Sequence, residues 1–213
     1  MATPCDLRFD CGRICLDLAA TTGGAPAERL TGPDQLRAWL TGAGLVPRGT
    51  PLDGLDAAWV GRFRALRELV RRLVHDELRG RASDADLALL NSAAASGQPP
   101  APRAVRTADG TLARALPGPP DCAGLLAAVA RDAVGLLTDE AARAQLRQCA
   151  GESCTLVYLD TSRGRRRRWC SSEVCGNRER VARHRRRTTV RREQNGSAGQ
   201  GPVPGAEKYS AEL

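Results

Sequence analysis

Hydrophobic residues recur at helical spacing over most of the first 146 residues. Between residues 53 and 78 they return every three or four positions opposite a face of arginines, which predicts a long amphipathic helix. The same spacing over residues 31–42 and 121–137, and a shorter stretch after residue 83, predicts further helices. Each of these three begins at a residue typical of helix N-termini, namely Pro33, Ser83 and Asp121. This part of the chain is therefore predicted to be mostly helical.

Three stretches favour strands instead. Residues 7–18 mix apolar and polar side chains over a short span and are interpreted as one or two strands. Residues 104–106 and 111–116 flank Asp109-Gly110, a short-range signal for a hairpin, and proline-rich segments enclose them. We therefore expect an α+β fold, with a mostly helical N-terminal domain that contains a few short strands and a hairpin.

The net charge of +8 is concentrated in one segment of the chain. Residues 1–146 carry 17 Arg and 17 acidic residues, whereas residues 147–192 carry 14 Arg and four acidic residues. Aromatic residues make up 3% of the chain, so the core must consist mainly of Leu, Ala and Val. A neutral domain joined to a strongly basic module suggests a nucleic-acid partner for the module.

Four cysteines occur within the basic module as two pairs. Gaps of four, fifteen and four residues separate Cys149, Cys154, Cys170 and Cys175. Thiolates at this spacing predict one tetrahedral zinc ion, held by two ligands from each of two short knuckles. Because four protein ligands leave no open coordination position, we expect the zinc to be structural. For Cys5, Cys11, Cys15 and Cys122 we prefer apolar packing to a second metal site.

The module is expected to resemble a treble-clef zinc finger. Residues 155–160 and 166–169 are predicted to form a hairpin between the two cysteine pairs, and a helix is predicted from Cys175 to Arg192. After Gln194 the chain is rich in Gly, Pro, Ser and Ala, which is typical of disorder. The expected domains are thus residues 1–146, the finger 147–192 and a disordered tail 193–213.

The arginines of the module are candidates for binding double-stranded DNA. They form one group in the predicted hairpin and one on the predicted helix, where residues three and four positions apart share a face. The alternative is a solvated charged face, and for Asn177 a helix cap or turn. The candidate contacts are Arg165, Arg166, Arg167, Arg168, Asn177, Arg178, Arg180, Arg183, His184, Arg187 and Arg191.

The segment Cys175-Gly176-Asn177-Arg178 and the paired cysteines before it resemble the CGNR zinc-finger family. Upstream, Leu16-Asp17-Leu18, residues 36–40 and Leu66-Arg67 resemble the ABATE domain, the usual N-terminal partner of that finger. The resemblance implies a stress-induced bacterial transcription regulator, in which the finger binds DNA and the ABATE domain senses a ligand or stress signal. The chain has Ala20 before Thr21 where the family often has Asn.

Other functions remain as alternatives. The finger is also consistent with an RNA-binding module, for which Tyr158 and Trp169 are the candidate stacking residues, or with a redox sensor that releases zinc. The only two histidines, His75 and His184, lie in charged stretches predicted to be helical, and the sequence has no phosphate-binding glycine loop. Both observations argue against an enzyme. The sequence shows no signal peptide or membrane span, so we expect a cytoplasmic, nucleoid-associated protein. A single small finger often needs a second copy for specificity, which leaves a homodimer open.

Overall fold

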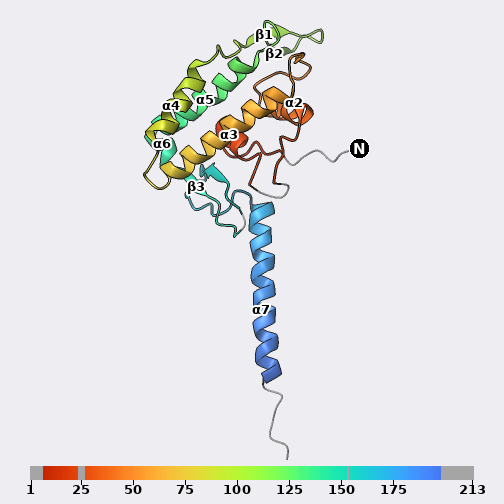
Figure 1. Cartoon of the computed structure of the whole chain (residues 1–213). Helices are drawn as coiled ribbons and strands as arrows, with labels where there is room; N and C mark the ends of the chain where they lie inside the picture. Colours follow the sequence, from red (N-terminus) through yellow and green to blue (C-terminus); the bar gives the residue numbers. More distant parts are fainter. Residues whose placement is uncertain (1–6, 24–26, 153, 198–213) are drawn as a thin grey trace, which may run out of the picture. The chain divides into compact units, whose positions relative to one another are not determined.

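The computed structural model describes residues 7–23, 27–152 and 154–197, with side chains described up to residue 188. The chain divides into two compact units, residues 1–170 and residues 171–213 (Figure 1). The elements of the first unit are α1 (Ile14–Ala19), α2 (Pro33–Gly42), α3 (Ala57–Glu77), α4 (Asp84–Ala95), β1 (Arg103–Arg106), β2 (Leu112–Ala115), α5 (Cys122–Thr138), α6 (Glu140–Arg143), β3 (Leu146–Gln148) and β4 (Val157–Leu159). The second unit contains the π-helical turn η1 (Ser172–Gly176) and α7 (Asn177–Ser197).

Most of the core of the first unit is formed by helices that the hydrophobic spacing predicted. In α3 the residues at that spacing are buried, and Phe63 packs edge-on against Trp39 of α2 with ring centroids 6.0 Å apart. Asp56 begins α3 by accepting a hydrogen bond from the Trp59 amide at 3.0 Å, and Asp121 begins α5 through the Gly124 amide at 2.7 Å. The prediction of a mostly helical N-terminal region is confirmed.

The strands predicted over residues 7–18 are wrong, because α1 occupies Ile14–Ala19. Every residue from Cys15 to Ala19 is buried, so this segment lacks the alternation of a half-buried strand. A short apolar run that is buried all round does not distinguish a strand from a helix by its pattern alone. Tertiary contacts decide the outcome, since Asp132 of α5 accepts a hydrogen bond from the Cys15 amide at 2.9 Å.

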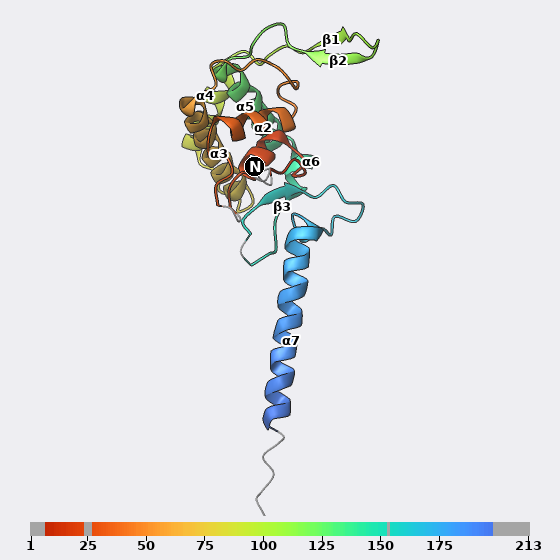
Figure 2. The same cartoon turned by 90° about the vertical axis from the view of Figure 1, so that its right-hand side faces the viewer.

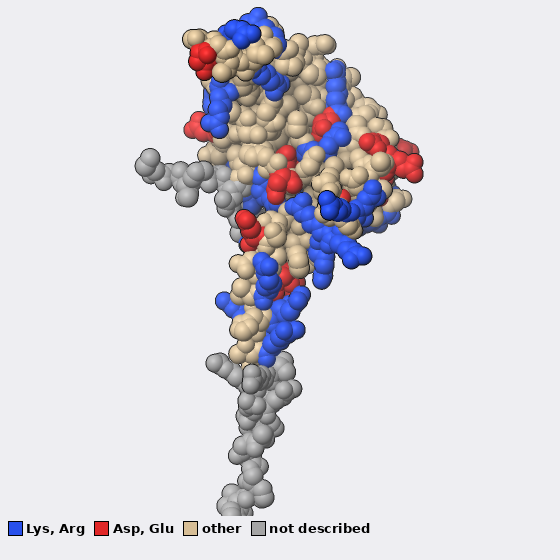
Figure 3. All heavy atoms as spheres, turned by 180° about the vertical axis from the view of Figure 1, so that it is seen from behind, with Lys and Arg blue, Asp and Glu red and all other residues tan. Residues whose placement is uncertain are grey.

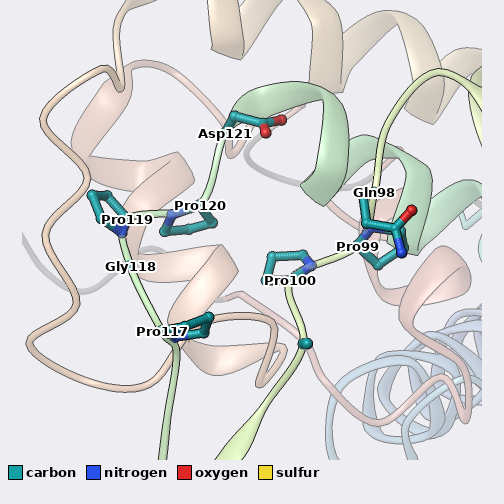
Figure 4. A pocket seen from close by; sticks show the side chains of 9 residues that line it. Gln98, Pro99, Pro100, Pro117, Gly118, Pro119, Pro120 and Asp121 are labelled. Carbon is teal, nitrogen blue, oxygen red and sulfur yellow. The ribbon is translucent and has the colours of Figure 1, made fainter.

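Two antiparallel hairpins lie at opposite ends of the helical body of this unit (Figure 2). The first pairs β1 with β2 in the register Arg106↔Leu112, as the Asp109-Gly110 turn predicted. The connections on either side of it line a surface pocket of about 460 Å³, in which five proline rings lie beside Gln98 and Asp121 (Figure 4). Since Asp121 is the single charged residue of that lining and already caps α5, the pocket offers few convergent polar groups to a ligand.

The second hairpin differs from the prediction. Strand β4 pairs with β3, in the register Leu146↔Leu159, and not with residues 166–169. The predicted boundary between residues 146 and 147 therefore falls inside β3. All three residues of β4 are buried, and the Leu159 amide donates to the Cys11 carbonyl at 2.9 Å. The first half of the cysteine module is thus packed on the N-terminal region.

The second unit consists of η1 and α7. The helix predicted up to Arg192 is present and continues to Ser197, which takes it into the segment predicted as a disordered tail. The rest of that tail lies outside the described residues. Within the described ranges, no helix is both long and apolar enough to cross a membrane.

Candidate metal centre and basic elements

The four cysteines of the paired motif come together in space. Cys149 and Cys154 lie in the connection between β3 and β4, Cys170 follows the arginine-rich loop, and Cys175 lies in η1. Their sulfur atoms all lie within 4.8 Å of one another, and all four residues are buried. The Cys154 and Cys170 sulfurs are 3.7 Å apart.

This arrangement fits a zinc ion. A tetrahedral site with zinc–sulfur bonds of about 2.3 Å separates its sulfurs by about 3.8 Å, close to the distance between Cys154 and Cys170. Hydrogen bonds from the Cys154 and Cys170 side chains lower the pKa of Cys149, while hydrogen bonds with Cys149 and Cys170 raise the pKa of Cys154. Four sulfurs this close cannot all be ionised without a cation, so the cluster has the donor set and the spacing of a metal site.

Nitrogen donors from the backbone and from Arg8 contact the sulfurs. The Cys170 amide donates to Cys149 Sγ at 3.3 Å, and the Arg8 guanidinium donates to Cys170 Sγ at 3.0 Å. Hydrogen bonds of this kind favour the thiolate form and orient it. The amide contact joins two cysteines that are 21 positions apart, one from each pair, and nothing in the sequence pattern pointed to Arg8.

The other described cysteines are also buried but are not members of this cluster. Burial raises the pKa of Cys11 to about 12 and that of Cys15 well above its ordinary value, while Cys122 is also buried at the start of α5. These thiols are therefore protonated and pack as small apolar side chains. Cys5 lies outside the described residues.

The arginine-rich loop between β4 and Cys170 is held by Asp160. Its carboxylate is fully buried and accepts hydrogen bonds from the Ser162 amide and hydroxyl and from the Arg167 amide, at 3.1, 2.6 and 3.0 Å. The hydrogen bonds from Ser162 lower the pKa of Asp160. This loop conformation replaces the second strand that was predicted over residues 166–169.

The loop divides the predicted run of DNA contacts into two classes. The side chains of Arg165, Arg166 and Arg168 are exposed. Arg167 instead lies over the ring of the fully buried Tyr158, 4.4 Å from its centroid, and donates to the Trp169 and Cys170 carbonyls. The Tyr158 hydroxyl donates in return to the Arg167 carbonyl at 2.7 Å. Arg167 is thus a packed side chain rather than a free cation.

Helix α7 exposes the remaining members of the predicted set whose side chains the structure describes. Figure 3 shows basic side chains along its described part. Arg180 also donates to the Ser172 carbonyl at 3.2 Å, and Arg186 lies 3.9 Å from Glu179. The side chain of Arg191 lies outside the described residues. The exposed members of the predicted set are Asn177, Arg178, Arg180, Arg183, His184 and Arg187.

A half-buried ion pair stabilises the N-terminal unit near Ala20. Arg67 of α3 donates to both carboxylate oxygens of Glu28 at 2.7 and 2.8 Å, and to the Thr21 hydroxyl at 3.2 Å. Ala20 itself is buried at the end of α1, and its carbonyl accepts from Arg29 at 3.3 Å. The position where the family often has Asn is thus enclosed by protein.

Comparison with known families agrees with this geometry. The ABATE family, described as "Putative stress-induced transcription regulator", matches residues 12–140, and the CGNR zinc finger matches residues 145–188. A search of curated proteins gives no match. The first match covers more than half of the chain and contains the helical core, and the second contains all four clustered cysteines. The chain belongs to the ABATE family and carries a C-terminal CGNR zinc finger.

Proposed function

We propose that the protein is a transcription regulator that binds double-stranded DNA through its zinc finger. One structural zinc ion would be bound by Cys149, Cys154, Cys170 and Cys175. The observation that carries the proposal is the sulfur cluster, which brings together the end of the arginine-rich loop and the start of α7. The zinc would supply a fixed coordination geometry for these two basic elements and no chemical reaction.

The exposed charges support DNA as the partner. Helix α7 has charged side chains around most of its circumference, and a helix that is polar all round has no apolar face to pack on a core. Arg183 and Arg187 lie four positions apart and repel each other, a cost that phosphates would relieve. The exposed arginines of the loop, with Arg178 and Arg180, would supply further phosphate contacts.

Duplex DNA is favoured over single-stranded RNA by the aromatic residues of the finger. Recognition of unpaired bases depends on exposed rings on which the bases stack. Tyr158 is fully buried, and the Arg168 guanidinium lies over the Trp169 ring at 5.3 Å from its centroid. Tyr158 is therefore not available as a stacking platform for RNA, and Arg168 covers one face of the half-buried Trp169 ring.

We further propose that residues 1–146 form a sensor domain and that residues 147–192 form the DNA-binding finger of a cytoplasmic, nucleoid-associated protein. The packing of β4 on the N-terminal region supports communication between them, because the Leu159 amide donates to Cys11. A change in the sensor domain would therefore reach the cysteine cluster through a short path of backbone contacts.

The test is a mobility-shift titration of the zinc-loaded protein with duplexes selected from random sequence, repeated at rising salt. Neutralising about 5–8 phosphates should give a log–log slope of about −5 to −7. Joint replacement Arg183→Gln and Arg187→Gln should weaken binding and reduce the slope by about 2, whereas the exposed Arg48→Gln should do neither. Equal affinity for selected and random duplexes would reject sequence-specific regulation, and tighter binding to structured RNA would favour the RNA alternative.

A further inference from the structure

The N-terminal segment of the chain contacts the cysteine cluster directly. Arg8 Nη1 donates to Cys170 Sγ at 3.0 Å, and Nη2 donates to the Cys170 carbonyl oxygen at 2.5 Å. Asp10 holds the same guanidinium through hydrogen bonds of 2.9 and 2.7 Å. The Arg8 side chain is only 15% exposed, so these contacts are largely shielded from water. Arg8 thus reaches a predicted metal ligand 162 positions away in the sequence.

The backbone next to Arg8 is fixed against the finger. The Cys11 carbonyl accepts a hydrogen bond from the Leu159 amide at 2.9 Å, and the Cys11 amide donates to the buried Asp17 at 3.0 Å. Gly12 has a φ of +94°, and a Cβ atom at this position would lie 3.0 Å from Leu159 Cβ. A side chain at Gly12 would strain the turn and push the segment away from β4. The docking that positions Arg8 therefore depends on a glycine at residue 12.

The charge of the site explains why this contact matters. A zinc ion with four thiolates carries a net charge of −2, and a guanidinium on one sulfur offsets part of it. Groups that hydrogen-bond a metal ligand orient it and raise metal affinity, typically by 10–100-fold. Asp10 in turn accepts two hydrogen bonds from the Arg8 guanidinium and keeps it oriented toward Cys170.

We propose that Arg8 is a positioning residue of the zinc site, through which the N-terminal segment controls how firmly the finger retains its metal. The proposal rests on zinc binding by the four cysteines. It goes beyond the family comparison, because Arg8 precedes both matched segments. By thermodynamic linkage, the reverse must also hold, so that loss of zinc weakens the docking of residues 8–12.

The first test measures the rate at which the full-length, zinc-loaded protein transfers zinc to a chromogenic chelator. Arg8→Gln should speed the release of zinc by about 10-fold or more. Arg8→Lys should have a smaller effect, because lysine keeps the positive charge but lacks the planar guanidinium that donates two hydrogen bonds to Cys170. Gly12→Ala should act in the same direction with Arg8 intact. The matched control is Arg48→Gln, because Arg48 is an exposed arginine in the loop after α2. This substitution should leave the rate of zinc release unchanged.

The second test measures hydrogen exchange at residues 8–12 in the zinc-loaded and zinc-free wild-type protein, where zinc removal should increase exchange. Unchanged release rates in both Arg8→Gln and Gly12→Ala would overturn the proposal, as would exchange that is insensitive to zinc. If the wild type binds zinc and DNA but zinc release or hydrogen exchange does not change as expected, only the role proposed for Arg8 is rejected. If the wild type binds no zinc, the proposed function is rejected as well.

Discussion

The neighbouring residues Arg166 and Arg167 should respond to mutation in opposite ways. Arg167 stacks on Tyr158 and donates to two carbonyls, whereas Arg166 is exposed. Hydrogen bonds from a charged donor contribute about 1.5–3 kcal/mol each when buried, and a cation–π contact about 0.5–1 kcal/mol. Because the Arg167 side chain is still 29% exposed, we expect Arg167→Gln to cost about 2 kcal/mol in unfolding free energy.

Urea unfolding of the zinc-loaded protein and a salt-dependent mobility shift separate the two roles. Arg167→Gln should lower the unfolding midpoint while leaving the salt slope of DNA binding nearly unchanged. Arg166→Gln should leave the midpoint unchanged and reduce the slope by about 1, as expected for loss of one phosphate contact. Equal effects of the two variants on both measurements, or a lower slope for Arg167→Gln alone, would refute the distinction.

Three further predictions follow from the same structure. Removing zinc with a chelator should unfold the finger and lower DNA affinity by at least about 10-fold, and adding zinc should restore both, as followed by circular dichroism and mobility shift. Burial raises the pKa of Asp17 to about 6, so its protonated form stabilises the fold and that contribution is lost as pH rises from about 4 to 6. Asp17→Asn should therefore be more stable than wild type at pH 7, by up to about 3 kcal/mol, with the difference vanishing near pH 4 in urea titrations. Arg67→Met should lower the unfolding free energy by about 2–3 kcal/mol in the same assay, which is less than for a fully buried pair because Glu28 is 32% exposed. A loss below about 0.5 kcal/mol would contradict a structural role for this ion pair.

Local signals in the sequence were enough to predict the main helices and the metal cluster. Helix α3 has a continuous apolar face and a capping Asp56, and α5 has Asp121, so short-range contacts determine where both begin. The cysteine spacing likewise predicted the cluster, because only four residues separate the cysteines of each pair and fifteen residues separate the two pairs.

Predictions failed where a segment had two competing partners. The region around α1 is apolar and short, and its helical form depends on contacts with Asp132, a residue more than a hundred positions away. Strand β4 could pair with the chain before it or after it. It pairs with β3, because Asp160 draws residues 162–167 into a loop that cannot form a ladder.

The sequence by itself determined that a neutral, mostly helical region is joined to a basic four-cysteine module, because composition, helical periodicity and cysteine spacing are local properties of the chain. Only the tertiary structure decided which arginines are free and which are packed. Arg166 and Arg167 are identical in type and adjacent, and their roles differ because of the loop path that Asp160 and Tyr158 impose. The contact of Arg8 with Cys170 was equally unpredictable, since it depends on how the folded chain brings two distant segments together.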